Sequence, residues 1–124
     1  YLSKIHGLLF LKYDKEMELW YEPRIVDFDR NDTLKIKGLS YENGFESFVS
    51  LSPNEQYVVI DNIIKGYVET PTGRELHENY KCVLIDLFSA RVLDFWQSEC
   101  SGEWDENSNW VNGDKIVFLS EMTK

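Results

Sequence analysis

The sequence has few of the residues from which catalytic and metal sites are built. Its 124 residues include only two histidines and two cysteines, whereas a structural zinc site needs about four ligands and a nucleophilic serine or cysteine needs a neighbouring base. The seven glycines are scattered singly, so no glycine-rich phosphate loop is present. No apolar run approaches the ~20 residues of a membrane helix. We therefore expect a soluble protein that is not an enzyme and holds no metal or cofactor.

Basic residues are also scarce in the second part of the chain. Residues 1–40 carry seven basic and seven acidic side chains, so the six basic and fifteen acidic ones in residues 41–124 account for the whole net charge of -9. Nucleic acids and anionic membranes bind to positive surfaces, and neither is expected as a partner. A basic protein is the natural complement, although an acidic charge also serves solubility alone.

What the sequence does contain is alternation of apolar and polar residues, which predicts β-strands rather than helices. Apolar stretches at residues 8–13 and 17–21 flank the polar residues 14–16, as in a hairpin. A half-buried strand is predicted next, with Leu34 and Ile36 facing the core.

Two longer segments, residues 48–64 and 80–96, are rich in the β-branched and aromatic residues that pack well on a sheet. Between them, residues 69–79 (ETPTGRELHEN) are polar and contain Pro71 and Gly73. Since proline is excluded from central strands, we predict a loop there.

Turn signals divide the remaining segments. A turn is predicted at residues 41–45, and Asn112-Gly113 is a strong hairpin signal before a last strand at residues 115–120. Residues 1–124 are therefore expected to form a single all-β domain. We predict an antiparallel meander of about eight short strands, arranged as an incomplete propeller-like sheet or a sandwich.

A faint internal repeat supports this fold class. LSPNEQYVV at residues 51–59 aligns without a gap with WVNGDKIVF at residues 110–118, and VLIDLFSARVL at residues 83–93 lies between them. Residues 46–120 thereby resemble blades of TolB-like and WD-repeat β-propellers, which implies a twisted meander that serves as a protein-binding platform. The two copies start 59 residues apart (110 minus 51), against the usual ~40 to 45, and a ring needs at least about four blades. No catalytic residue is implied.

The segment 92–114 stands apart in composition. It has no lysine or arginine and combines aromatic residues, Trp104 among them, with acidic ones. Tryptophan is a common anchor of protein interfaces, and surrounding acids would steer a cationic partner. Its six carboxylates belong to Asp94, Glu99, Glu103, Asp105, Glu106 and Asp114.

Part of this segment has the spacing of a calcium loop, since Asp105, Asn107 and Asn109 occupy alternate positions. The sixth and twelfth positions of such a loop should be glycine and glutamate. Here they are Trp110 and Ile116, so we predict a polar loop that leads into a strand.

The cysteines and histidines do not indicate a catalytic site. Cys82 lies in an apolar strand pattern, which predicts a small buried side chain, and Cys100 lies in a polar turn, which predicts an exposed thiol. Their spacing does not decide whether they pair. His6 is predicted to be a hydrogen-bonded strand residue, and His77 an exposed one.

Small size, a β scaffold and localised acidity together match, by analogy of composition, bacterial immunity proteins of the contact-dependent growth inhibition type. Such a protein would inhibit a basic nuclease toxin by stoichiometric binding, with carboxylates in place of the phosphates that the nuclease binds. We expect a monomer within a 1:1 complex, in the cytoplasm, with the periplasm as the alternative because a segment before Tyr1 could have been a signal peptide. The predicted contact residues are Glu103, Trp104, Asp105 and Glu106, with Glu75 and Glu78 behind them.

Two other functions are kept open. The first is a β-sheet module of the cell envelope that binds a peptide or protein edge-on, which requires an unpaired edge strand. The second is a small hydrolase built on two carboxylates in one cleft, which requires at least one raised pKa.

Overall fold

The computed structural model of the chain describes residues 2–39, 44–113 and 115–119. All regular structure in these residues is β-strand, which confirms the all-β prediction, and none of them forms a helix that could span a membrane. The strands are β1 (His6–Asp14), β2 (Leu19–Asp27), β3 (Asp32–Lys35), β4 (Gly44–Leu51), β5 (Tyr57–Thr70), β6 (Gly73–Asp86), β7 (Arg91–Trp96), β8 (Glu103–Trp104), β9 (Trp110–Asn112) and β10 (Lys115–Phe118).

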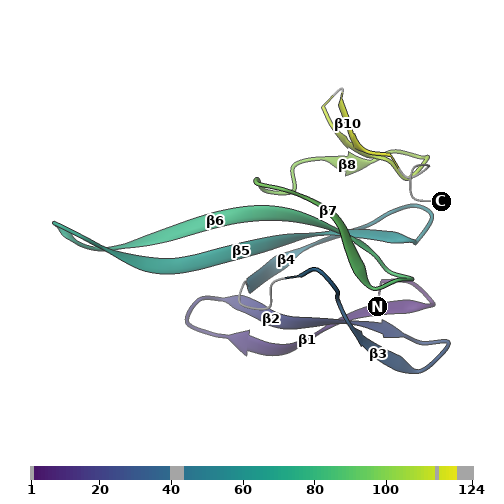
Figure 1. Cartoon of the computed structure of the whole chain (residues 1–124), viewed down its shortest axis with the longest axis horizontal. Coiled ribbons are helices and arrows are strands. Elements are labelled where there is room, and N and C mark those ends of the chain that lie inside the picture. The colour runs from purple at the N-terminus through teal and green to yellow at the C-terminus, as the bar shows by residue number, and fades with distance from the viewer. Residues whose placement is uncertain (1, 40–43, 114, 120–124) are drawn as a thin grey trace.

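Seven of these strands form one antiparallel sheet, in the order β1-β2-β4-β5-β6-β7 with β3 also paired to β2. The other three form a small separate sheet in the order β10-β9-β8. Figure 1 shows three layers, with β1 to β3 below, β4 to β7 in the middle and the small sheet above. Most neighbours in the sheets are also neighbours in the chain, so the predicted antiparallel meander is confirmed.

Within the body, β5 and β6 are buried on both faces. Alternate residues of a strand point to opposite sides, and all residues from Tyr57 to Ile60 and from Cys82 to Ile85 are buried. This two-sided burial explains the uninterrupted apolar runs YVVI in β5 and CVLI in β6. The lower core, which includes a residue of β2, consists of Ile25, Ile36, Phe45, Val58, Ile60, Val83, Ile85, Leu87 and Ala90. The upper core, which the small sheet covers, consists of Tyr57, Val59, Cys82, Leu84, Trp110 and Phe118.

Two hairpins predicted from the sequence are confirmed. Asp14 pairs with Leu19, and the Asp14 carboxylate accepts backbone N–H groups of the loop between them at 3.0 and 3.2 Å. Asn112 pairs with Lys115 across a loop that includes Gly113, whose φ is +66°. Residue 114 of this loop lies outside the described residues, as do residues 41–43 of the turn predicted at 41–45.

The prediction of a loop at residues 69–79 is wrong. β5 and β6 continue as one hairpin, each strand 14 residues long, and only Pro71 and Thr72 lie between them. Apolar alternation marks a strand with one buried face, whereas both faces of this part of the hairpin are in solvent. Pro71 falls in the turn, where its missing N–H breaks no ladder hydrogen bond.

One smaller prediction, the burial of Leu34, needs correction, and the number of strands is somewhat higher than predicted. Leu34 is 36% exposed, because β3 pairs only with β2 at the rim of the sheet and all four of its residues are exposed. Ile36, just beyond β3, is buried as predicted. The described residues form ten strands rather than about eight, and the two longest are far from short.

One long-range contact curls the large sheet. Lys37 donates its backbone N–H to the Ala90 carbonyl, and Val92 donates to the Lys37 carbonyl, both at 2.9 Å. The segment after β3 is thereby joined to the outer edge of β7. The paired strands still end at β1 and β7, so the sheet is not closed.

Candidate protein-binding surfaces

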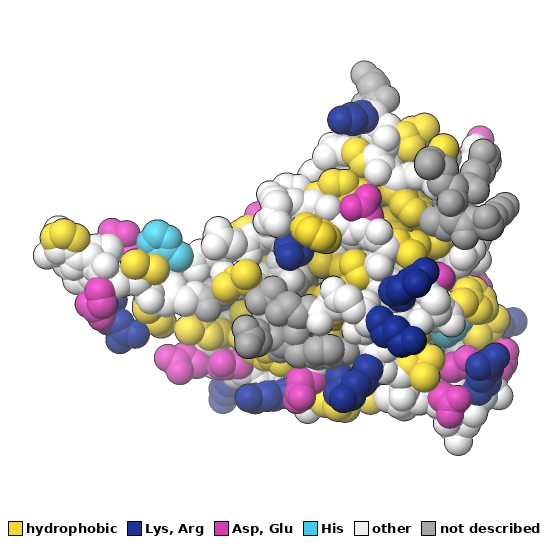
Figure 2. All heavy atoms as spheres, viewed as in Figure 1, with side chains coloured by type: hydrophobic (Ala, Val, Ile, Leu, Met, Phe, Trp, Pro, Cys, Tyr) yellow, Lys and Arg dark blue, Asp and Glu magenta, His cyan; other side chains and the backbone are white. Residues whose placement is uncertain are grey.

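The two longest strands extend beyond their neighbours. β4 pairs with β5 only as far as Ile63, and β7 pairs with β6 only as far as Cys82. Beyond these points residues 64–70 and 73–81 pair with each other, and no other strand in the described part of the chain pairs with them. We call this hairpin, residues 64–81, the arm. Figures 1 and 2 show it projecting from the rest of the molecule.

The tip of the arm is a tight turn with its own local bonds. Thr70 pairs with Gly73, and the Thr70 hydroxyl donates to the Gly73 carbonyl at 2.9 Å. The φ of Gly73 is +133°, a conformation that residues with a side chain rarely adopt. These residues explain why the chain reverses here without any core beneath it.

Large apolar side chains are exposed on both faces of the arm. Tyr67 and Leu76 lie opposite each other on one face, where the Arg74 guanidinium carbon is 4.5 Å from the centre of the Tyr67 ring. A two-stranded ribbon has no layer to cover it, so its apolar groups stay in solvent. In Figure 2 hydrophobic side chains on the arm lie among charged ones. Their exposed fractions are Ile64 49%, Tyr67 49%, Val68 45% and Leu76 47%.

Acidic residues gather at the base of the arm. The Tyr80 hydroxyl donates to Glu78 Oε2 at 2.7 Å. This bond, together with burial and the negative charges of Glu78, Glu46 and Glu99, raises the pKa of Tyr80 to about 12. Glu75 is on the opposite face of the strand, where its carboxylate lies 3.7 Å from His77. Glu78, Glu46 and Glu99 therefore form one acidic region around Tyr80.

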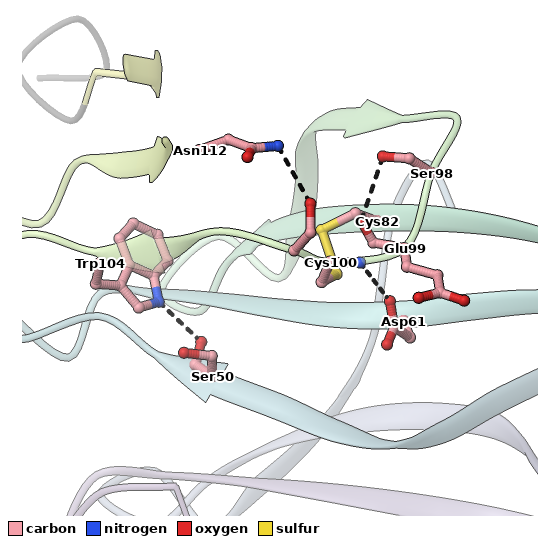
Figure 3. Close-up of a disulfide and its surroundings, with 9 residues drawn as sticks. Ser50, Asp61, Cys82, Ser98, Glu99, Cys100, Trp104 and Asn112 are labelled. Carbon is pink, nitrogen blue, oxygen red and sulfur yellow. Dashed lines mark hydrogen bonds between the residues drawn. A yellow bond between two sulfur atoms is a disulfide. The ribbon is translucent and has the colours of Figure 1, made fainter. Parts of the chain in front are cut away.

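Trp104, predicted to be an interface anchor, is packed into the upper core. Its indole N–H donates to the Ser50 carbonyl at 3.1 Å, as Figure 3 shows. Its ring centre is 5.2 Å from that of Trp110 and 6.2 Å from that of Tyr57. The side chain is half-buried, so Trp104 serves mainly to hold β8 against the middle layer.

Asp105 is turned toward its own loop. Its Oδ1 accepts the backbone N–H groups of Asn107 and Asn109, both at 2.9 Å, and its Oδ2 accepts the Asn109 side-chain amide at 3.2 Å. The backbone bond from Asn109 is the main cause of a lowered Asp105 pKa. The carboxylate therefore closes the polar loop predicted here. No group of three metal-ligating side chains is found among the described residues.

The six predicted contact residues do not form one surface. Glu103 and Glu106 are exposed at the ends of the loop that Trp104 and Asp105 hold. Glu75 and Glu78 are exposed on the arm, whose tip projects away from β8 (Figure 1). The structure thus places Glu75 and Glu78 on the arm, and Glu103 and Glu106 on the acidic segment, by which we mean residues 92–113. The two surfaces meet at the base of the arm, where Glu99 lies near Tyr80.

Cys82 and Cys100 form a disulfide, a pairing that their spacing left open. Cys82 is buried as predicted, whereas Cys100 is not a free thiol. The Cys100 N–H donates to Asp61 Oδ1 at 2.8 Å, as Figure 3 shows. Burial raises the pKa of Asp61, and the nearby Glu99 carboxylate adds to the shift. The acidic segment is therefore joined to β6 by a covalent bond and to β5 by a hydrogen bond.

The histidines form no catalytic set in the described residues. His6 is buried at the start of β1, with its ring edge-on to Phe88 at 4.8 Å. Its Nδ1 has no hydrogen-bond partner among the described residues, so the predicted hydrogen-bonded side chain is not observed there. His77 is exposed on the arm as predicted.

A hollow of about 430 Å³ at the end of the β1–β2 hairpin is lined by Lys12, Asp14, Tyr21 and Glu22. It holds two carboxylates, the requirement of the hydrolase alternative. However, Asp14 already accepts two backbone N–H groups as the cap of its turn. Burial, and then the Asp14 charge, raises the pKa of the Tyr21 phenol, which is the wrong group for acid catalysis by paired carboxylates. The hollow gives this alternative no support.

Comparisons with protein families, with curated proteins and with solved structures found no match for this chain. The resemblance to a propeller blade stays a prediction. The sequence analysis did not single out the exposed apolar residues of the arm. The sequence Pro71-Thr72-Gly73 is typical of a turn and lies midway between two segments of equal length. This pattern could have indicated a long hairpin here.

Proposed function

We propose that this protein is a non-catalytic binding module that recognises an extended segment of another protein edge-on, along the arm. The observation that carries the proposal is that, among the described residues, residues 64–70 and 73–81 pair as strands only with each other, which leaves a strand edge on each side of the arm. Each edge presents backbone N–H and C=O groups that an added strand can bind, while side chains on the faces give specificity. Ile64 and Val68 on one face, and Tyr67 and Leu76 on the other, would supply those contacts.

The disulfide supports a place in the cell envelope or outside the cell. Disulfides persist in oxidising compartments and are rare in the cytosol, where thiols are kept reduced. The sequence favoured the cytoplasm, with the periplasm as the alternative. The Cys82–Cys100 bond is an argument for that alternative.

The inhibitor of a basic nuclease remains a second candidate because of the acidic segment. Glu99, Glu103 and Glu106 are exposed there, and no lysine or arginine occurs between Val92 and Gly113. The indole bond of Trp104 to Ser50 keeps the segment in one position, and a rigid surface binds at a lower entropic cost. Under this candidate the basic partner would contact the exposed carboxylates.

One experiment separates the two candidates by comparing three immobilised proteins in affinity purification from the source organism. The first is the wild type. In the second, residues 66–77 are replaced by Asn-Gly, which forms a tight turn between the paired residues at 65 and 78. The third carries Glu103→Lys and Glu106→Lys. We expect the shortened arm to lose the partner, while the charge-reversed protein retains it at both low and high salt.

The binding site is then located by hydrogen exchange. In the complex, the amides of residues 64–70 or 73–81 should exchange more slowly than in the free protein, because an added strand binds their backbone groups. Retention of the partner by the shortened arm would contradict the proposal. Loss in the charge-reversed protein, together with strong salt dependence, would establish the nuclease-inhibitor candidate in its place.

A further inference from the structure

The charges along the free edge of β6 are ordered so that the edge complements itself. In the sequence GRELHEN, at residues 73–79, Leu76 is central, with Glu75 and His77 on either side and Arg74 and Glu78 beyond them. We propose that this edge pairs antiparallel with the same edge of a second copy of this chain, centred on Leu76. The inference rests on the proposed function, since it names the strand that occupies one of the two edges.

The register follows from symmetry. When two identical antiparallel strands are related by a two-fold axis, paired residues have numbers with a constant sum, and that sum is even because partners share a face. With Leu76 opposite itself, Arg74 lies opposite the partner's Glu78. On the other face, Glu75 lies opposite the partner's His77. Each contact occurs twice.

Neighbouring registers lack this complementarity. Centring on Glu75 would place that carboxylate against its own copy and Arg74 against an apolar side chain. Centring on His77 would place the histidines together and Leu76 against the partner's Glu78. Like charges directly opposite each other are unfavourable across strands, and opposite charges are favourable. The charge order therefore favours the Leu76 register.

The side chains are placed for these contacts. Leu76 is 47% exposed, so a second copy would bury apolar surface at the centre. Glu78 accepts the Tyr80 hydroxyl with Oε2, but a carboxylate has about four acceptor sites and can also bind a guanidinium. His77 and Glu75 are 3.7 Å apart within one chain. In the dimer, His77 and Glu75 of both copies would lie together on one face of the sheet.

Such a dimer replaces the monomer expected from the sequence. Its arms would form a four-stranded sheet, β5-β6-β6-β5, in which the two β5 strands are outermost. No other strand in the described part of the chain pairs with residues 64–70, so this edge then remains open in each copy. The dimer would therefore offer two identical edges to partner segments, and linked sites raise the overall binding strength when both can be occupied.

The test uses charge exchange and sedimentation equilibrium of the full chain at low salt in the micromolar range. We expect the wild type to dimerise. Arg74→Glu and Glu78→Arg should each lower the association constant at least about tenfold, because two ion pairs become two like-charge pairs. An equimolar mixture of the two variants should dimerise again, since every contact then joins opposite charges.

Glu103→Arg is the matched control, with the same change of charge as Glu78→Arg but at an exposed position of β8, away from the arm. It should leave the dimer intact. Urea unfolding of each variant checks that the body remains folded, which is expected because no residue of the arm belongs to either core.

A monomeric wild type, or charge-reversed variants that dimerise as well as the wild type, would overturn the inference. If the monomeric wild type still binds its partner through the arm, the dimer is refuted and the proposed function stands. If the protein dimerises as described but its shortened arm still binds the partner, the dimer stands and the proposed function fails.

Discussion

The two halves of the β5–β6 hairpin share one backbone pairing but differ in the burial of their side chains. They pair without a register shift from Tyr57–Asp86 to Thr70–Gly73, yet the half within the body is buried on both faces and the arm is exposed on both. Burial specifies register, because a slip of one residue would move every core side chain to the wrong face. The body thus sets the register that the arm continues. The side chains of the arm are then free to serve recognition.

The largest expected effect comes from making the same leucine-to-alanine substitution in the two halves of β6, once in the body and once in the arm. Leu84→Ala should lower the free energy of unfolding by about 2 to 5 kcal/mol, because Leu84 is fully buried. Leu76→Ala, at a position 47% exposed, should change it by less than about 0.5 kcal/mol. Urea unfolding at a protein concentration low enough for the chain to be monomeric measures both. Similar losses in the two variants would mean that the arm is part of the cooperative unit.

Removal of the disulfide should come next in size and act on the body alone. The bond joins residues 18 apart in the sequence, and a loop of this size contributes about 3 kcal/mol by restricting the unfolded chain. Urea unfolding of the Cys82→Ala, Cys100→Ala double variant tests this value. Sedimentation should show the same dimerisation as in the wild type. An unchanged unfolding midpoint would mean that packing alone holds the acidic segment.

Replacing a glycine in the body and one in the arm should give smaller effects on stability that also differ between the two regions. At Gly44 an added Cβ would lie 2.5 Å from Leu19 Cδ1, so Gly44→Ala should cost about 1 to 3 kcal/mol by overpacking. At Gly66, on the arm, nothing lies within 4 Å. Gly66→Ala should be neutral or should stabilise the protein by up to about 1 kcal/mol, because alanine loses less conformational entropy on folding. Thermal unfolding of the two variants should therefore move the midpoint in opposite directions or leave the second unchanged.

The smallest effect lies at the boundary between body and arm. Glu78→Gln should lower the pKa of Tyr80 from about 12 toward its ordinary value of 10.0, because a carboxylate that accepts the phenol proton opposes formation of a second negative charge. Ultraviolet titration of tyrosinate measures the shift. Glu75→Gln is the control, since Glu75 points to the opposite face of β6. An equal shift in the control would point to net charge rather than to the hydrogen bond.

The same contrast explains how much of the fold could be predicted from the sequence. Strands of the body were identified because burial leaves a pattern, such as YVVI and CVLI in the two central strands. Residues 69–79 of the arm were predicted to be a loop, because a ribbon in solvent needs no apolar periodicity. Pairing with a well-ordered strand can support a polar segment such as residues 73–79, and this support comes from the neighbouring body rather than from the segment's own composition.

The candidate site was predicted only in part. The acidic segment was recognised from composition, but composition does not show which side chains are already engaged. Trp104 binds a carbonyl of the middle layer and Asp105 binds its own loop, whereas Glu103 and Glu106 stay exposed. The disulfide could not be deduced either, because two cysteines pair only if the fold brings them close together, and their spacing in the sequence does not show this.

The hydrogen bonds of Lys37 bear on the order in which the chain folds. Hairpins such as β1–β2 and β5–β6 join neighbouring parts of the chain, and such local contacts form quickly. Lys37 and Arg91 are 54 residues apart (91 minus 37), so their contact must close a much longer loop. We expect it to form late, after the hairpins have shortened the path between its ends. Residues near the rim of the sheet would then complete a fold whose centre is already in place.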